Sequence, residues 1–188
     1  DVVYLIPPRH NLLIQNNVLY LTRPDNKSNR HLNLPIDIFF KSLAEERQDK
    51  AIAIILSGTG SDGARGIRAI KENEGMVMVQ HKESAKFDGM PASAIATGIV
   101  DYILPAEKMG KKLLNYIEHP YLKENKNLTK KSSKEESELI KILNLIKNNI
   151  GIDFNRYKEK TVIRRIERRM IINQIQGLDN YLDYLYNY

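Results

Sequence analysis

The residues best suited to chemistry follow the most apolar segment of the chain. Residues 51–56 (AIAIIL) are a continuous apolar run, and a glycine-rich turn, 57–63 (SGTGSDG), comes directly after it. Such a run is typical of a parallel strand covered on both faces. Open α/β sheets build their sites at the carboxyl ends of such strands. We therefore expect Asp62, in this turn, to lie at a functional edge of a sheet.

Three interpretations of Asp62 stay open on spacing alone. It could cap the amino terminus of the helix that follows it. The turn could bind phosphate, although it lacks the later Gly-Lys-Ser/Thr of a P-loop. Asp62 could also be the acid of a hydrolase triad, which orients a histidine. No Gly-x-Ser-x-Gly elbow surrounds any of the nearby serines, namely Ser57, Ser61, Ser84 and Ser93.

A second feature is a basic stretch near the carboxyl end. Residues 154–170 include seven basic and two acidic side chains. The spacing of Ile163, Ile166 and Met170 predicts a helix with an inward apolar stripe. Four arginines are expected on its outer face, Arg164, Arg165, Arg168 and Arg169. Because like charges at this spacing repel, an anionic partner would stabilise them; a solvated face and a nucleic-acid-binding helix are the alternatives.

Strands and helices alternate through the first part of the chain. The expected strands are 2–6, 51–56, 76–79 and 100–104, and the expected helices are 35–48, 64–74, 91–98 and 105–117. Asn16-Asn17, between the short β-forming segments 12–14 and 18–21, predicts a hairpin. The alternation predicts an α/β fold, part of a mostly parallel doubly wound sheet.

The composition changes at Glu118. Residues 123–134 contain five lysines and almost no apolar side chain, which is typical of a solvated linker. Ser133 and Glu136 have the spacing of a capping box, and helices are expected at about 133–149, 156–172 and 178–186. We expect three regions, an α/β part over 1–117, a basic linker over 118–134 and a small all-α domain over 135–188.

Composition narrows the possible functions. The chain has no cysteine, which excludes disulfides, thiolate metal sites and a cysteine nucleophile; no metal site is expected. It has neither an apolar run of membrane-spanning length nor a signal peptide, so we expect a cytoplasmic protein without membrane insertion. It begins at Asp1 rather than methionine, and we interpret this start as a cut.

Four motifs in the first part carry a family resemblance. They are 6–10 (IPPRH), 30–31 (RH), 56–64 (LSGTGSDGA) and 84–91 (SAKFDGMP). Together they resemble the carboxyl half of CheB-type protein-glutamate methylesterases, over about residues 1–117. The resemblance implies that Asp62 is the aspartate of a Ser-His-Asp triad and that the backbone near Thr59 belongs to the oxyanion-stabilising loop.

The same resemblance implies that the family serine and histidine precede the start of this chain. His10 and His31 correspond to other family positions, and His81 and His119 receive no role. We therefore expect the chain alone to be inactive as an esterase. The receiver domain usual in this family is also missing, so nothing is inferred about control by phosphorylation.

The last part carries a second resemblance. Residues 151–170 and 177–182 are similar to the amino-terminal helices of CheR-type methyltransferases, over about 137–188. This implies that the four arginines bind the acidic cytoplasmic helices of chemoreceptors. It also implies that the S-adenosylmethionine domain lies beyond Tyr188, so this piece itself would hold no cofactor.

The two resemblances imply a fused enzyme of chemotaxis adaptation. One part would hydrolyse methyl esters of receptor glutamates, and the other would transfer methyl groups from S-adenosylmethionine. A non-catalytic docking relic is the alternative, and a nucleic-acid-binding helical module is a weaker one, so no nucleic acid is expected as a partner.

Overall fold

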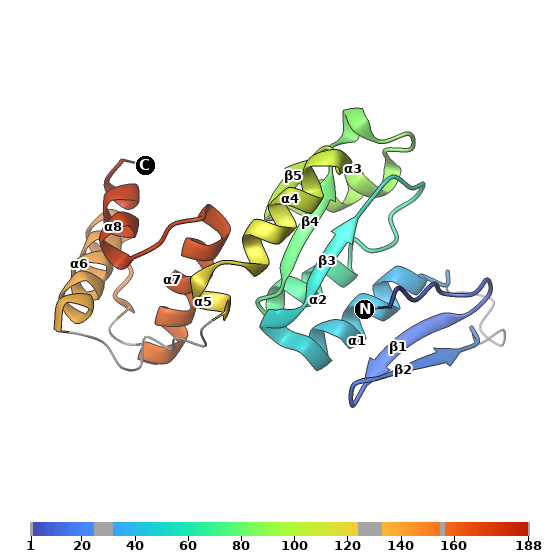
Figure 1. The fold of residues 1–188 in the computed structure, drawn as a ribbon, viewed down its shortest axis with the longest axis horizontal. Coiled ribbons are helices and arrows are strands. Elements are labelled where there is room, and N and C mark those ends of the chain that lie inside the picture. Colours follow the sequence, from blue (N-terminus) through green and yellow to red (C-terminus); the bar gives the residue numbers. More distant parts are fainter. Residues whose placement is uncertain (1, 25–31, 124–132, 155–156, 188) are drawn as a thin grey trace. The chain divides into compact units, whose positions relative to one another are not determined.

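A computed structural model describes residues 2–24, 32–123, 133–154 and 157–187. The chain divides into two compact units, Asp1–Met109 and Gly110–Tyr188. Figure 1 shows the elements of both along the sequence. His31 and Arg156 lie outside the described residues, as does most of the expected linker.

A three-stranded parallel sheet lies at the centre of the first unit. Its strands, in spatial order, are β3 (Ile52–Ile55), β4 (Met76–Gln80) and β5 (Tyr102–Leu104). All five residues of the middle strand, β4, are buried, so both of its faces are covered. The connections carry α2 (Gly66–Glu72), the short turn η2 (Lys82–Ser84) and α3 (Gly89–Ile95). The expected α/β class with a parallel sheet is confirmed.

A hairpin and a long helix complete this unit. The strands β1 (Asn11–Gln15) and β2 (Val18–Thr22) pair antiparallel around Asn16-Asn17, as expected. Both asparagines have positive φ, 49° and 62°, which this residue type tolerates. Glu46, in α1 (Pro35–Arg47), accepts from the backbone amides of both asparagines at 3.2 and 2.8 Å. The hairpin therefore lies against α1 (Figure 1), which η1 (Gln48–Lys50) connects to β3.

The expected strand at residues 2–6 is wrong. These residues have no regular secondary structure, and the exposed fractions of Val3 and Leu5 are 87% and 88%. An apolar segment becomes a strand only where a neighbouring strand satisfies its backbone groups. Among the described residues, the strands of each sheet pair only with one another, and none of them pairs with residues 2–6.

The second unit is helical. It contains most of α4 (Ala106–Ile117), then α5 (Pro120–Lys123), α6 (Ser133–Ile150), α7 (Glu159–Asn173) and α8 (Leu178–Tyr186). Its core consists of Leu139, Ile142, Val162, Ile163, Ile166, Met170, Leu178 and Tyr181. The inward stripe predicted for the basic helix is therefore confirmed, although α7 begins later than expected.

Candidate active-site loops and basic helix

Two glycine-containing loops, far apart in sequence, interlock at the carboxyl edge of the parallel sheet. The first follows β3 and the second precedes α3. Gly58 donates its amide to the Phe87 carbonyl, and Met90 donates to the Gly58 carbonyl, both at 2.9 Å. A Cβ on Gly89 would lie 3.0 Å from the Gly60 backbone nitrogen, so the close approach of the loops favours glycine. The motifs at 56–64 and 84–91 are therefore one structure.

Gln80, which the sequence analysis did not select, ties both loops to the end of β4. Its side chain is buried. The Oε1 atom accepts from the Ser57 amide at 2.8 Å, and Nε2 donates to the Ser84 carbonyl at 2.9 Å. A polar residue ending an otherwise apolar strand was the available signal. Gln80 therefore fixes the position of both loops through these two hydrogen bonds.

Asp62 is held by α1, and not by the helix that follows it, which one of the three interpretations had it cap. Its Oδ2 accepts from the Ile36 amide at 3.0 Å, and its Oδ1 accepts from the Asp37 amide at 2.9 Å. Asp62 thus caps α1, whereas Arg65, the residue that precedes α2, makes no side-chain capping hydrogen bond. The carboxylate is half-buried. Each oxygen has a second lone pair. Asp62 can therefore accept a further hydrogen bond, for example from an imidazole N–H, while it caps α1.

The other candidate residues near the two loops are either exposed or hydrogen-bonded to nearby backbone groups. Thr59 is exposed, next to Gly60 with a φ of +83°. The Ser57 hydroxyl oxygen accepts from the Phe87 amide at 2.9 Å, and the Ser84 hydroxyl donates to the His81 carbonyl. His10 donates from Nδ1 to the Pro8 carbonyl at 2.9 Å. Among the described residues, no histidine hydrogen-bonds to Asp62.

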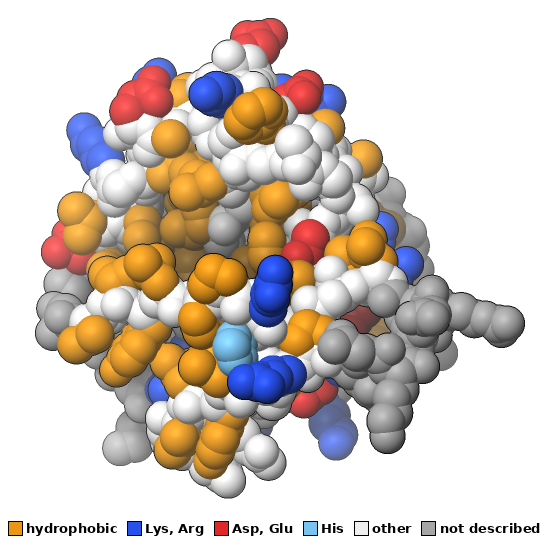
Figure 2. Space-filling model, turned by 90° about the vertical axis from the view of Figure 1, so that its right-hand side faces the viewer, with side chains coloured by type: hydrophobic (Ala, Val, Ile, Leu, Met, Phe, Trp, Pro, Cys, Tyr) orange, Lys and Arg blue, Asp and Glu red, His pale blue; other side chains and the backbone are white. Residues whose placement is uncertain are grey.

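Many apolar side chains of the first unit are exposed. Figure 2 shows hydrophobic side chains gathered over one face of the molecule. The exposed apolar residues nearest the amino terminus are Val2, Val3, Tyr4, Leu5, Ile6, Val18, Tyr20 and Leu21. A contiguous apolar surface such as the one in Figure 2 usually marks a place where another element or protein packs.

The four arginines of α7 do not share one environment. Arg164, Arg165 and Arg169 are exposed, but Arg168 is half-buried. Its guanidinium lies 5.2 Å from the ring centroid of Tyr116 and donates to the Tyr116 hydroxyl. Placing Arg168 on the exposed outer face was therefore wrong, because a buried tyrosine from α4 covers it. Burial raises the pKa of Tyr181, and the nearby Arg169 guanidinium partly opposes that rise.

His119 is a buried histidine in the region expected to be a solvated linker. Only 3% of it is exposed, and its ring stacks on Tyr121. The Nε2 atom contacts the Ile175 carbonyl at 3.2 Å. Because a carbonyl only accepts, Nε2 carries the proton and Nδ1 is the basic atom. Nδ1 is buried without a hydrogen-bond partner among the described residues. Residues 119–121 are therefore part of the helical unit.

Acid should weaken the packing of this segment. Burial lowers the pKa of His119, and the hydrogen bond to Ile175 opposes this effect only in part. As the pH drops below the unfolded pKa of about 6.5, the unfolded state binds more protons than the folded state. The stability of the folded state therefore decreases as the pH decreases. Protection of the α7 and α8 amides against hydrogen exchange, relative to the intrinsic rate at each pH, should fall as the pH drops below about 6.5. The His119→Gln variant, which keeps a donor, should lose this extra dependence; an unchanged pH dependence would contradict the assignment.

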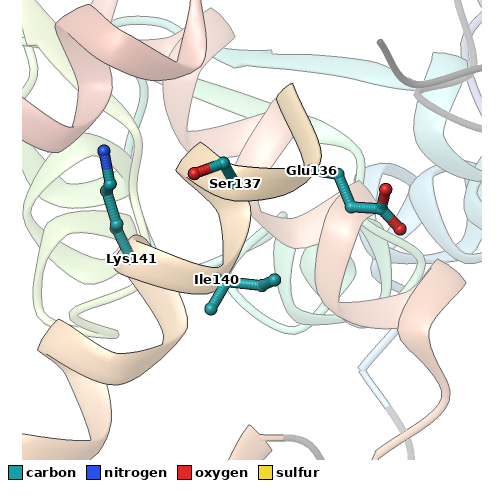
Figure 3. Close-up of a pocket in the computed structure, with 4 residues that line it drawn as sticks. All are labelled: Glu136, Ser137, Ile140 and Lys141. Carbon is teal, nitrogen blue, oxygen red and sulfur yellow. The ribbon is translucent and has the colours of Figure 1, made fainter. Parts of the chain in front are cut away.

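Two further features of the described residues were considered as ligand sites, a pocket on α6 and clusters of metal-binding side chains. A shallow pocket on α6 is lined by Glu136, Ser137, Ile140 and Lys141, and Figure 3 shows that these side chains point in different directions. Within the described ranges, no three acidic, histidine or cysteine side chains are close enough to hold a metal ion. No described helix is long and apolar enough to cross a membrane.

Comparison with protein families matches both parts of the chain. The family model for the CheB methylesterase matches residues 1–113. The model for the all-alpha domain of the CheR methyltransferase matches residues 137–187. The two matched segments leave residues 114–136 between them, which include the segment that carries His119.

Several known proteins are similar to this chain. An uncharacterized 104.1 kDa protein of Rhodobacter capsulatus is 36% identical over 98% of the chain, which spans 21% of that protein. A putative protein-glutamate methylesterase/protein-glutamine glutaminase of Leptospira interrogans is 39% identical over 58% of the chain and 56% of its own length. The crystal structure of the Thermotoga maritima CheB methylesterase catalytic domain is 36% identical, with a TM-score of 0.48 and 56% of each chain covered.

Proposed function

Because the chain belongs to the CheB methylesterase family, we propose that it is part of a chemotaxis adaptation enzyme that fuses a protein-glutamate methylesterase to a protein-glutamate methyltransferase. The intact enzyme would hydrolyse methyl esters of receptor glutamates with one part. The other part would transfer methyl groups from S-adenosylmethionine. The observation that carries the proposal is Asp62, which lies in the first of the two interlocked loops at the sheet edge and accepts from two backbone amides of α1.

In the esterase part, Asp62 is the acid of the triad, and the loop at Thr59 contributes to oxyanion stabilisation. The serine and histidine would come from a segment outside residues 1–188. Such a segment would pack on the exposed apolar face of the first unit and bring its histidine to Asp62. This arrangement accounts for apolar side chains that are exposed in the chain by itself.

The transferase part rests on the match of residues 137–187 to the all-alpha domain of CheR methyltransferases. The Rhodobacter capsulatus relative aligns along both parts of the chain, which supports a real fusion. The S-adenosylmethionine domain would follow residue 188. The substrate of both reactions would be the acidic helices of chemoreceptors in the cytoplasm.

Two assays of the intact protein test this proposal. Methanol release from a methyl-esterified receptor measures the esterase, and transfer of labelled methyl from S-adenosylmethionine to an unmethylated receptor measures the transferase. We expect both. Methanol release without methyl transfer would leave the esterase and overturn the fusion, and absence of both would overturn the proposal.

The exposed arginines of α7 should contribute to receptor binding. Replacing Arg164, Arg165 and Arg169 together by Gln should weaken binding to a labelled acidic receptor helix about tenfold, because three exposed ion pairs contribute about 0.5 kcal/mol each. Added salt should reduce the difference. Arg168 is left intact because it packs on Tyr116.

The control for this measurement is Lys141→Gln, an exposed residue of α6, which should bind as the wild type does. Equal, salt-insensitive binding by the triple variant would show that this face is only solvated. Binding to duplex DNA with none to the receptor helix would favour a nucleic-acid partner instead.

A further inference from the structure

Asp37 connects the amino termini of two helices to Asp62. It stands in the first turn of α1. Its backbone amide donates to Asp62 Oδ1 at 2.9 Å. Its own carboxylate accepts from the amide of Gly66, the first residue of α2, at 2.6 Å. The capping is therefore reciprocal. Asp62, which precedes α2 in the chain, caps α1, and Asp37, which lies in α1, caps α2.

The reciprocal capping depends on a close approach of the two helices. A Cβ on Gly66 would lie 2.7 Å from the Phe40 Cβ, closer than Cβ atoms approach in proteins, and 3.0 Å from the Asp37 Cα. Only glycine allows the Gly66 amide to reach the Asp37 carboxylate. The loop that carries Asp62 is thus held to α1 at two points. The Asp62 carboxylate accepts from two α1 amides, and the Gly66 amide, at the start of α2, donates to Asp37.

We propose that Asp37 is a positioning residue for the esterase reaction, acting through Asp62. This inference rests on the proposed function, in which Asp62 orients the triad histidine. Orientation requires a carboxylate plane that does not rotate. The two α1 amides fix that plane, and Asp37 fixes where α1 begins relative to the loop. Asp37 itself does not contact substrate.

The test is steady-state kinetics of the intact protein across pH. Asp37→Ala should lower kcat about 10- to 100-fold with little change in KM, because a displacement of about 1 Å in a catalytic group has effects of this size. The acid limb of the kcat/KM profile should move to lower pH. The reason is that a misplaced carboxylate stabilises the imidazolium less, so the pKa of the base falls.

Two further variants separate positioning from folding. Asp37→Asn keeps an oxygen that can accept from the Gly66 amide, and it should restore most of kcat and the wild-type acid limb. Asp37→Glu keeps the charge in the first turn but moves the carboxylate by one methylene, so it should show the kinetic defect even if Asp37→Ala fails to fold. Glu45→Ala, an exposed acidic residue of the same helix, is the matched control and should behave as the wild type does.

The possible outcomes distinguish this inference from the proposed function. Wild-type kinetics in Asp37→Ala, or in Asp37→Glu if Asp37→Ala does not fold, would overturn the positioning role while Asp62→Asn remained inactive. A kcat that falls only in proportion to the loss of folded protein, with the acid limb unchanged, would also overturn the positioning role. Asp37 would then be a purely structural residue. Absence of esterase turnover in the wild type would instead overturn the proposed function.

Discussion

In the intact protein, Asp62→Asn should lower the esterase kcat about 10⁴-fold, the size of the effect in well-studied triads. The carboxylate would hold the histidine in the correct tautomer and stabilise its cation during proton transfer. An amide can do neither, because its nitrogen donates where the acid must accept. The measurement is methanol release from methyl-esterified receptor at saturating substrate.

The contacts of Asp62 also predict a stability change in this variant. Both oxygens accept backbone amides of α1, and an asparagine can satisfy only one of them. The other amide would face an NH₂ group, which costs about 1–3 kcal/mol when a part-buried donor is left unsatisfied. Thermal unfolding should therefore show a modest loss of stability with the fold retained.

A matched control is Glu45→Gln, since Glu45 is an exposed acid of α1 outside the two loops. It should leave kcat and stability unchanged. Near-wild-type turnover in Asp62→Asn, together with the stability loss, would reduce Asp62 to the cap of α1. That outcome would remove Asp62 from the triad and require another acid at this edge of the sheet.

The elements that local pattern determines were predicted from the sequence. The apolar run at 51–56 contains β3, and Asn16-Asn17 forms the turn of the hairpin. The apolar stripe of α7 faces the helical core. In each case the pattern of neighbouring residues was sufficient, because the periodicity of burial is a local property.

The contacts around the candidate site could not be predicted in the same way. Asp62 caps a helix that begins 27 positions earlier in the chain, and Arg168 donates to Tyr116, 52 positions away. His119 seemed to lie in a linker because its neighbours are polar, yet its partner is Ile175. Such pairs depend on tertiary packing, and nothing in a single sequence reports which distant residues meet.

The chain of residues 1–188, tested by itself, should hydrolyse receptor methyl esters about 10⁶-fold more slowly than the intact enzyme. Removing the serine or the histidine of a hydrolase triad has about this effect, and the remaining rate comes from binding and oxyanion stabilisation. In the proposed enzyme, both residues lie outside this chain. The Ser57 and Ser84 hydroxyls are hydrogen-bonded within the loops, and among the described residues no histidine hydrogen-bonds to Asp62.

Introducing Asp62→Asn into this isolated chain separates triad chemistry from contamination. Without a histidine to orient, the carboxylate has no catalytic task, so the variant should release methanol no faster and no slower than the unmodified chain. The same substitution in the intact protein should abolish most of its turnover. Release above the buffer rate by the isolated chain, lowered by Asp62→Asn, would mean that the chain contains its own nucleophile and base. The search for both would then return to the serines and histidines around the interlocked loops, beginning with Ser61, which is exposed beside Asp62.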